Sequence, residues 1–166
     1  VTNNKRAVKM PEDMKGLKLR TTPNPAHLQA FRLLGANPVP MPITEVYLAL
    51  KTGAVDGQEN PIAHIYAMKF HEVQKYMSLT FHAYTSSVVV MNLKKFQELK
   101  PEHQKIFMES VQEAANWERK LNRELDAECL TKIKAAGVQV EENPDREAFR
   151  KAVADATADE YVKKFG

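Results

Sequence analysis

One uninterrupted stretch, residues 101–136, restricts the possible folds more than any other part of this 166-residue chain. After Pro101 it contains no glycine and no further proline, and its apolar side chains recur at helical spacing: Phe107, Val111, Ala114, Leu121, Leu125, Cys129 and Ile133. At about 1.5 Å per residue a helix here would reach roughly 50 Å, whereas a globule of this size is roughly 40 Å across. The sequence therefore predicts a long helix that either bends or lies along a second body. A coiled-coil dimer is the alternative, although the stripe drifts from a strict heptad.

The rest of the chain alternates short apolar runs with amphipathic segments, which is typical of β/α units. Strands are expected at residues 17–21, 37–42, 55–58, 76–81, 87–92 and 138–140. Shorter helices are expected at residues 25–34, 45–52 and 61–68 and at the C-terminal end. The predicted fold class is α/β.

Composition argues against several functions. The net charge is only +3, and lysines and arginines are scattered among acids, so nucleic acid is not an expected partner. The longest apolar run, residues 88–91, is too short to span a bilayer. The single cysteine, Cys129, excludes an internal disulfide, and the histidines are too scattered to predict a metal site. We also find no cofactor-binding motif.

A predicted strand leads into a helix at three junctions, residues 20–24, 42–45 and 59–61, and each junction carries polar residues. Arg20 ends the first strand, and a planar guanidinium can hold a carboxylate through two parallel hydrogen bonds. The alternative is that Arg20 pairs with a nearby acid such as Glu12 or Asp13. Because ligands collect at the carboxyl ends of parallel strands, the three junctions would together form half of a cleft.

The two other junctions leave alternatives open. Residues 55–61 place several hydrogen-bonding side chains between two apolar segments, which suits a polar ligand. Asn60 either contacts that ligand or only caps the helix that begins at Pro61. Ile43 either walls a pocket or packs onto the helix that follows it.

Five segments occur in a characteristic order and spacing: GLKLR at 16–20, LGANPVPM at 34–41, EVYLAL at 45–50, GAVDGQENP at 53–61 and EVQKY at 72–76. With His82 after them, they closely resemble the extracytoplasmic solute receptors of TRAP transporters, the DctP-type family. By resemblance, Arg20 clamps the carboxylate of a small organic acid and Asn60 reinforces the grip. Glu59 and His82 match a polar network around the site, and Ile43 replaces a bulky aromatic that often stacks on the ligand.

Receptors of this family have two α/β lobes with a cleft between them, and the chain resembles the C-terminal portion only. The resemblance implies that residues 1–85 and 126–166 build the second lobe. Residues 86–125 would cross the hinge and give a strand and a helix to the first lobe, so the long helix would straddle both. The resemblance also implies a periplasmic location with the signal peptide removed, a membrane permease as partner, and no cofactor or metal.

Three functional hypotheses follow. The leading one is a carboxylate-binding receptor of a secondary transporter. The second is an enzyme with His82 or Glu59 as general base, although the sequence offers no nucleophile or metal to accompany it. The third is a truncated domain that forms an oligomer or domain swap without binding a ligand. The sequence alone does not identify the acid.

Overall fold

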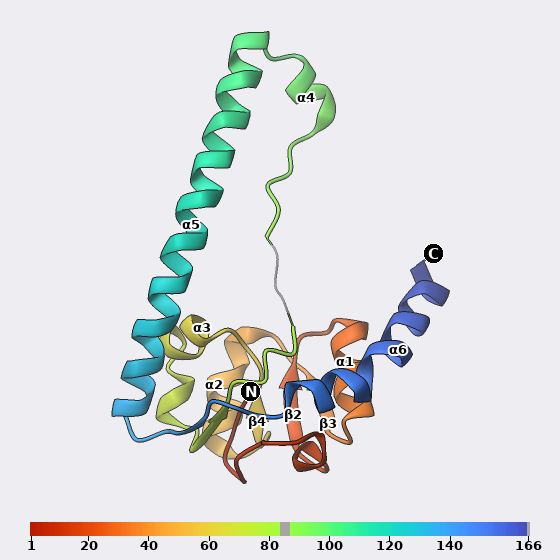
Figure 1. Ribbon diagram of the computed structural model, residues 1–166, viewed down its shortest axis with the longest axis vertical. Coiled ribbons are helices and arrows are strands. Elements are labelled where there is room, and N and C mark those ends of the chain that lie inside the picture. The colour runs from red at the N-terminus through yellow and green to blue at the C-terminus, as the bar shows by residue number, and fades with distance from the viewer. Residues whose placement is uncertain (84–86, 166) are drawn as a thin grey trace.

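The computed structural model describes the backbone of residues 1–83 and 87–165, with the side chains of residues 155–161 and 163–165 left out of the description. A compact α/β body carries one long helix that projects far beyond it (Figure 1). Residues 87–92 and helix α4 (Leu93–Gln97) also lie outside the body, and α4 is near the far end of the long helix. The α/β fold class is therefore confirmed.

The described residues contain a six-stranded mixed sheet with the order β3-β2-β4-β1-β5-β6. The strands are β1 (Thr2–Asn3), β2 (Lys18–Thr21), β3 (Asn37–Pro40), β4 (Gly57–Gln58), β5 (Tyr76–Ser78) and β6 (Gln139–Glu141). Strand β2 is parallel to both β3 and β4, and β5 is parallel to β6. Strand β1, which the sequence analysis did not predict, runs antiparallel to β4 and β5 and joins the two parallel parts.

The helices are α1 (Pro25–Leu33), α2 (Ile43–Thr52), α3 (Ile62–Ala67), α4 (Leu93–Gln97), α5 (Pro101–Ala135) and α6 (Arg146–Phe165), with short 3-10 turns η1 (Pro11–Met14) and η2 (Phe70–Glu72). The predicted helix ends have clear local causes. The Asn24 side chain accepts a hydrogen bond from the Ala26 N–H at the start of α1. Gly53 ends α2 in the left-handed conformation, with φ 74°.

Two buried apolar clusters hold the body together. One joins α2, α3 and α5 to the sheet and includes Val46, Ile65, Met77 and Ile133. The other joins α1 and α6 to the sheet and includes Leu19, Phe31 and Phe149. The core therefore lies around the sheet, and polar residues are buried at the carboxyl ends of β2 and β4: Arg20, Thr21, Gln58 and Glu59.

The predicted strand at residues 87–92 is wrong for this chain, because these residues form no strand. Val88, Val89 and Val90 are 78%, 68% and 83% exposed. A strand needs a neighbour for its backbone groups, and none of the described residues supplies one here.

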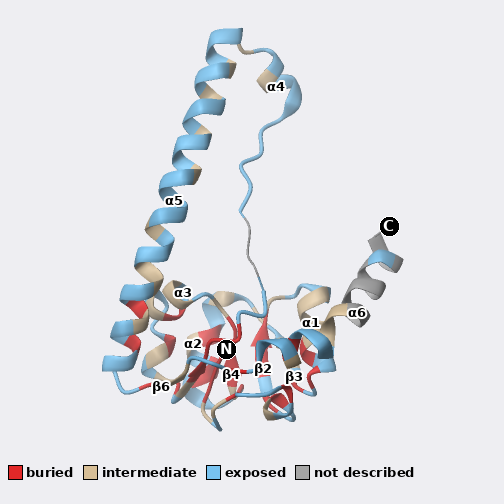
Figure 2. Cartoon of the chain, in the orientation of Figure 1, coloured by how far each residue is buried: buried red, intermediate tan, exposed pale blue. Residues whose placement is uncertain are grey.

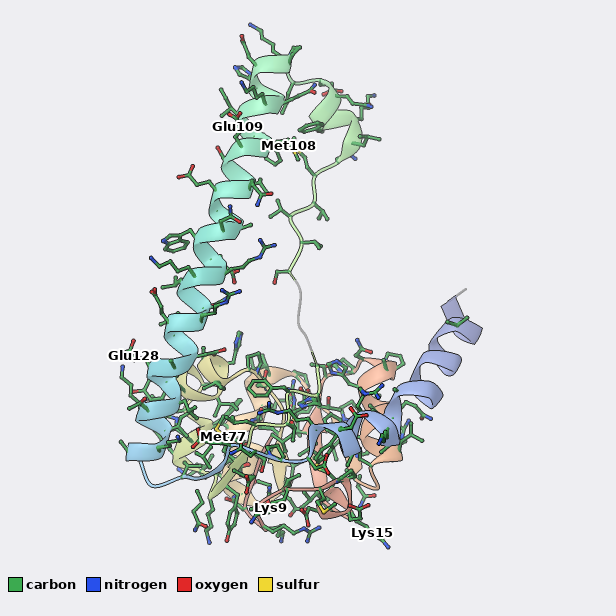
Figure 3. The ribbon with its side chains drawn as sticks, viewed as in Figure 1. Lys9, Lys15, Met77, Met108, Glu109 and Glu128 are labelled. Atoms are coloured by element: carbon green, nitrogen blue, oxygen red, sulfur yellow. The ribbon has the colours of Figure 1, made fainter. Side chains whose placement is uncertain are left out.

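The single long helix is confirmed as α5, which spans 35 residues. Its buried residues are Cys129 and Ile133, both in the part that packs on the body, and most of the projecting part is exposed (Figure 2). Figure 3 shows Met108 and Glu109 far from the body, whereas Glu128 lies close to it. The helix thus extends beyond its own body, as its length predicted. The domain bounds remain a prediction, and their junction at residues 85 and 86 lies outside the described residues.

Candidate functional site

Arg20 lies in β2, between β3 and β4, and pairs in register with Val39 on one side and Gln58 on the other. Its residue is only 2% exposed. Nε and Nη2 donate hydrogen bonds to the carbonyl oxygen of Met41, at 3.0 and 2.7 Å. The alternative in which Arg20 pairs with Glu12 or Asp13 is wrong: Asp13 instead accepts from the backbone N–H groups of Lys9 and Met10.

The remaining nitrogen of Arg20, Nη1, is buried and has no hydrogen-bond partner among the described residues. A guanidinium has five N–H groups, and the two bonds to Met41 leave three of them, two on Nη1 and one on Nη2. These two nitrogens form the end of the guanidinium fork, which matches a carboxylate in shape and charge. A buried N–H without a partner costs free energy, and an anionic group that reached it would remove that cost.

Asn60 follows β4 and does not cap α3, because the N-cap residue of that helix is Pro61. Its Nδ2 donates to Oε1 of Gln58 at 2.6 Å. Gln58 in turn donates from Nε2 to Oγ1 of Thr2 at 3.0 Å, and Thr2 donates to Gln74 at 2.9 Å. Gln58 is therefore the register partner of Arg20 and the hydrogen-bond partner of Asn60, so the two predicted ligand residues flank the same glutamine.

The carboxylate of Glu59 contacts side chains from three other segments of the chain. Its carboxylate accepts from Oγ1 of Thr21 at 2.8 Å, and lies 3.3 Å from Nε2 of His82 and 3.8 Å from Nδ1 of His27. His82 is itself held at Nδ1 by Oγ1 of Thr80, at 2.8 Å. The structure thus brings Glu59 and His82 together; Glu59 directly precedes Asn60, and its partner Thr21 directly follows Arg20.

These contacts set the charges of the network. Burial raises the pKa of Glu59, but its hydrogen bonds with Thr21 and His82 and its contact with His27 outweigh that effect and hold its pKa well below the ordinary value. The nearby Glu59 carboxylate raises the pKa of His27. Burial lowers the pKa of His82 more than Glu59 raises it. Glu59 is therefore an anion at neutral pH that raises the pKa of both histidines, and only for His82 does burial outweigh this effect.

Sequence reasoning missed His27 and Thr21 as partners of Glu59. His27 lies in the first turn of α1, the helix that follows β2. Strand alternation places Thr21 on the face opposite to Arg20. The positions of His27 and Thr21 beside the first strand-to-helix junction were the only sequence signal that they belong to the site. The parallel pairing of β2 with β4, which brings both residues to Glu59, could not be read from either segment alone.

Ile43 is the first residue of α2 and is partly buried against the core cluster formed by α2, α3 and α5. It therefore contributes to the core from within α2, whereas the second alternative placed it before that helix. A contact between Ile43 and a ligand remains a prediction. A surface hollow lined by Met108, Glu109, Gln112, Glu113 and Asn116 belongs to the projecting half of α5 and is not part of this site.

Two classes of feature are absent from the part of the chain that the structure describes. No group of three or more His, Cys, Asp or Glu residues there is placed to hold a metal ion. No helix there combines the length and apolar character needed to cross a membrane.

Comparison with known proteins gives one consistent family. The model of the bacterial extracellular solute-binding proteins, family 7 (DctP), matches residues 1–164. The 2,3-diketo-L-gulonate-binding periplasmic protein of Escherichia coli is 47% identical over 163 residues, which is 98% of this chain and 50% of that protein. The chain therefore spans about half the length of the curated relatives it matches.

Solved structures agree with this result. A TRAP periplasmic solute-binding protein from Ochrobactrum anthropi, with its C-terminus bound in the ligand-binding pocket, matches with a TM-score of 0.92 and 42% identity over 99% of this chain and 52% of its own. One from Polaromonas, bound to D-erythronate, matches with a TM-score of 0.87 and 40% identity over 98% of this chain and 54% of its own. The fold is that of one lobe of such proteins.

Proposed function

The chain belongs to the bacterial extracellular solute-binding proteins of family 7, and from that premise we propose that it forms half of a receptor for a small organic acid in a TRAP-type transporter. Arg20 binds the carboxylate of the acid, and Asn60 donates a second contact from its amide. Glu59 and His82 hold the surrounding polar network, and Ile43 lines the pocket. No covalent step, cofactor or metal takes part.

The unpaired end of the Arg20 fork carries this proposal. Nη1 is buried without a partner among the described residues, while Nε and Nη2 are fixed on Met41. An arginine that served only the fold would be expected to satisfy its buried N–H groups within the protein. Here the protein orients the guanidinium from one side and leaves the other side for an anion, which is the arrangement that a carboxylate clamp needs.

The second half of the pocket would come from the other lobe. The chain spans about half of its relatives, and α5 projects beyond the lobe with most of its length exposed (Figures 1 and 2). In the intact receptor, meaning this chain joined to a first lobe, residues 86–125 would cross the hinge and pack there. Binding would then consist of capture by Arg20 followed by closure of the lobes, and the closed receptor would deliver the acid from the periplasm to a membrane permease.

An enzyme that uses His82 or Glu59 as a general base is less well supported. Glu59 already accepts from Thr21 and contacts two histidines, and its depressed pKa makes it a weak base. The fragment hypothesis, an oligomer without a ligand, leaves the buried Nη1 of Arg20 without an explanation.

Calorimetric titration of the intact receptor with a panel of small organic acids tests the proposal. The panel includes D-erythronate, 2,3-diketo-L-gulonate and D-galacturonate, with the uncharged sugar galactose as control. We expect one or more acids to bind and the uncharged sugar to fail, since only an acid can pair with the guanidinium. Failure of every acid, or turnover of a bound acid into product, would show that the proposed function is wrong.

A further inference from the structure

Helix α3 begins without a cap of its own. Its N-cap residue, Pro61, makes no side-chain capping hydrogen bond. The N–H of Ala63, the second residue of the helix, instead donates to Oδ1 of Asp126 at 3.1 Å. An N-cap side chain usually accepts from this position, so a carboxylate 63 residues further along the chain takes the place of the local cap. Its negative charge also suits the N-terminal end of the helix dipole.

Asp126 lies where α5 leaves the lobe. Cys129, one turn further along, is the first buried residue of α5, and Ile133 follows it. On the other side of Asp126 the helix becomes the projecting part shown in Figure 3, which carries Met108. Helices α3 and α5 pack against each other, so the hydrogen bond joins them at the point where the long helix emerges.

The other end of this hydrogen bond is close to the proposed ligand site. Only Pro61 and Ile62 separate Ala63 from Asn60, and the proline ring restricts the backbone between them. On its other side, Asn60 is preceded by Glu59, whose carboxylate is fixed on Thr21. A shift of α5 at Asp126 would therefore reach Asn60 through few rotatable bonds.

We propose that Asp126 is a positioning residue that ties the segment carrying Asn60 to the long helix. This inference rests on the proposed function, because it assigns Asp126 a role in placing the amide that contacts the acid. When the first lobe moves, the projecting half of α5 moves with it. Because the Ala63 N–H donates to Asp126, the movement of α5 also displaces Asn60. The helix and the ligand segment are thus coupled through one charged hydrogen bond.

A matched control is available in the same lobe. Oδ1 of Asp145 caps α6 by accepting from the N–H of Ala148 at 2.9 Å, and α6 packs on α1 and η1. Asp145→Ala therefore removes a cap of the same chemistry without touching α3. Asp126→Ala removes the acceptor at α3, whereas Asp126→Asn keeps an oxygen in the same place and should rescue the effect.

The first measurement needs no ligand. NMR of the 166-residue protein follows the side-chain amide signals of Asn60 and the hydrogen exchange of the Ala63 N–H. In Asp126→Ala we expect shifted Asn60 signals and exchange of Ala63 faster by roughly fivefold, the equivalent of one lost cap. Asp126→Asn should restore most of both, and Asp145→Ala should change neither. Unshifted Asn60 signals in Asp126→Ala, or equal shifts in Asp145→Ala, overturn the inference whether or not any acid binds.

The second measurement is a double-mutant cycle on affinity in the intact receptor, with D-erythronate as the probe. We expect Asp126→Ala to weaken binding by roughly 2- to 30-fold in the wild-type background and to add little in the Asn60→Ala background. Equal losses in both backgrounds contradict a route through Asn60. Failure of every acid to bind the wild type overturns the proposed function instead, and the NMR result then decides this inference by itself.

Discussion

The guanidinium of Arg20 donates two hydrogen bonds to the carbonyl oxygen of Met41, from Nε at 3.0 Å and from Nη2 at 2.7 Å. Met41 precedes α2, so the bonds join the end of β2 to the start of the next strand-to-helix junction. They fix the orientation of the fork before any ligand arrives. Preorganisation of this kind lowers the cost of binding, since the side chain loses little further freedom when the acid docks.

Arg20→Lys is expected to weaken acid binding by roughly 30-fold or more, because an ammonium cannot form two parallel hydrogen bonds and the loss of a buried charged contact costs about 2 kcal/mol or more. It should also lower the free energy of unfolding by about 1 kcal/mol, since one bond to Met41 is lost. Calorimetry and urea denaturation measure the two effects. Arg32→Lys, at an exposed position of α1, is the control, and an unchanged affinity in Arg20→Lys would refute the clamp.

Asn60→Asp is expected to weaken acid binding more than Asn60→Ala does. The new carboxylate would repel an acid and would face Oε1 of Gln58, which now accepts from Asn60 Nδ2 at 2.6 Å. Calorimetry at low and high salt measures the effect, because salt screens the repulsion between the two charges to the extent that solvent reaches them. Asn143→Asp, at an exposed position before α6, is the control. Equal affinities for the Asp and Ala variants would show that Asn60 does not face the acid.

Much of the fold could be predicted because its signals are local. Asn24 and Pro25 mark the start of α1, and a glycine-free stretch marks α5. Strand β1 could not be predicted, since two residues between non-consecutive partners carry no period of their own. The strand expected at residues 87–92 was wrong for a related reason: an apolar run becomes a strand only beside a neighbour.

The candidate site likewise combines features that local sequence predicts with features that depend on contacts between distant segments. Arg20 and Asn60 could be named from motif and position, whereas the bond between Arg20 and Met41 and the gathering of His27 on Glu59 depend on which strands lie side by side. The alternative in which Asn60 caps α3 is wrong, and the acceptor at the start of α3 is Asp126 of the distant helix α5. A single sequence does not predict contacts between segments that are far apart along the chain.

The pH dependence of His27 should report the Glu59 carboxylate. The pKa of His27 is raised above its ordinary value of 6.5, chiefly by the Glu59 carboxylate that lies 3.8 Å from its Nδ1. Because the folded pKa exceeds the unfolded one, this pair stabilises the fold fully below pH 6.5, and the contribution disappears as the pH rises through the folded value. NMR titration should therefore show the His27 pKa falling in Glu59→Gln.

His82 offers an internal contrast in the same titration. Burial lowers its pKa, and Glu59 partly opposes that shift, so Glu59→Gln should lower the His82 pKa further. Glu72→Gln is the matched control, since Glu72 accepts from the Tyr47 hydroxyl in a different part of the lobe. An unmoved His27 pKa in Glu59→Gln would mean that the carboxylate does not set the charge of this network.

Gly57→Ala is expected to destabilise the fold by about 3 kcal/mol or more. A Cβ added at Gly57 would lie 2.1 Å from the carbonyl oxygen of Thr2, where β4 pairs with β1, and that backbone cannot move without breaking the sheet. Gly53→Ala is the control: its added Cβ meets nothing within 4 Å, and only the positive φ of 74° opposes it, at about 1 kcal/mol. Urea denaturation of the two variants measures the difference, and equal stabilities would contradict the close approach of β1 to β4.

The 166-residue chain is expected to associate when it lacks a first lobe. Val88, Val89 and Val90 are 78%, 68% and 83% exposed, and their unpaired backbone groups can pair with a second copy. Sedimentation velocity should therefore show dimers or larger species at micromolar concentration.

Replacing both Val88 and Val90 with serine should reduce that association, because it removes the apolar side chains that the contact would bury. Val162→Ser, at another exposed valine, in α6 (65%), should leave the association unchanged. A monomeric wild-type chain whose amide protons at residues 88–91 resist exchange would contradict the prediction. Those residues would then be covered within the same chain, in contrast to the exposed surface in Figure 2. If it associates and those protons are protected only in the associated species, residues 88–91 form the contact, at the surface where a first lobe would pack.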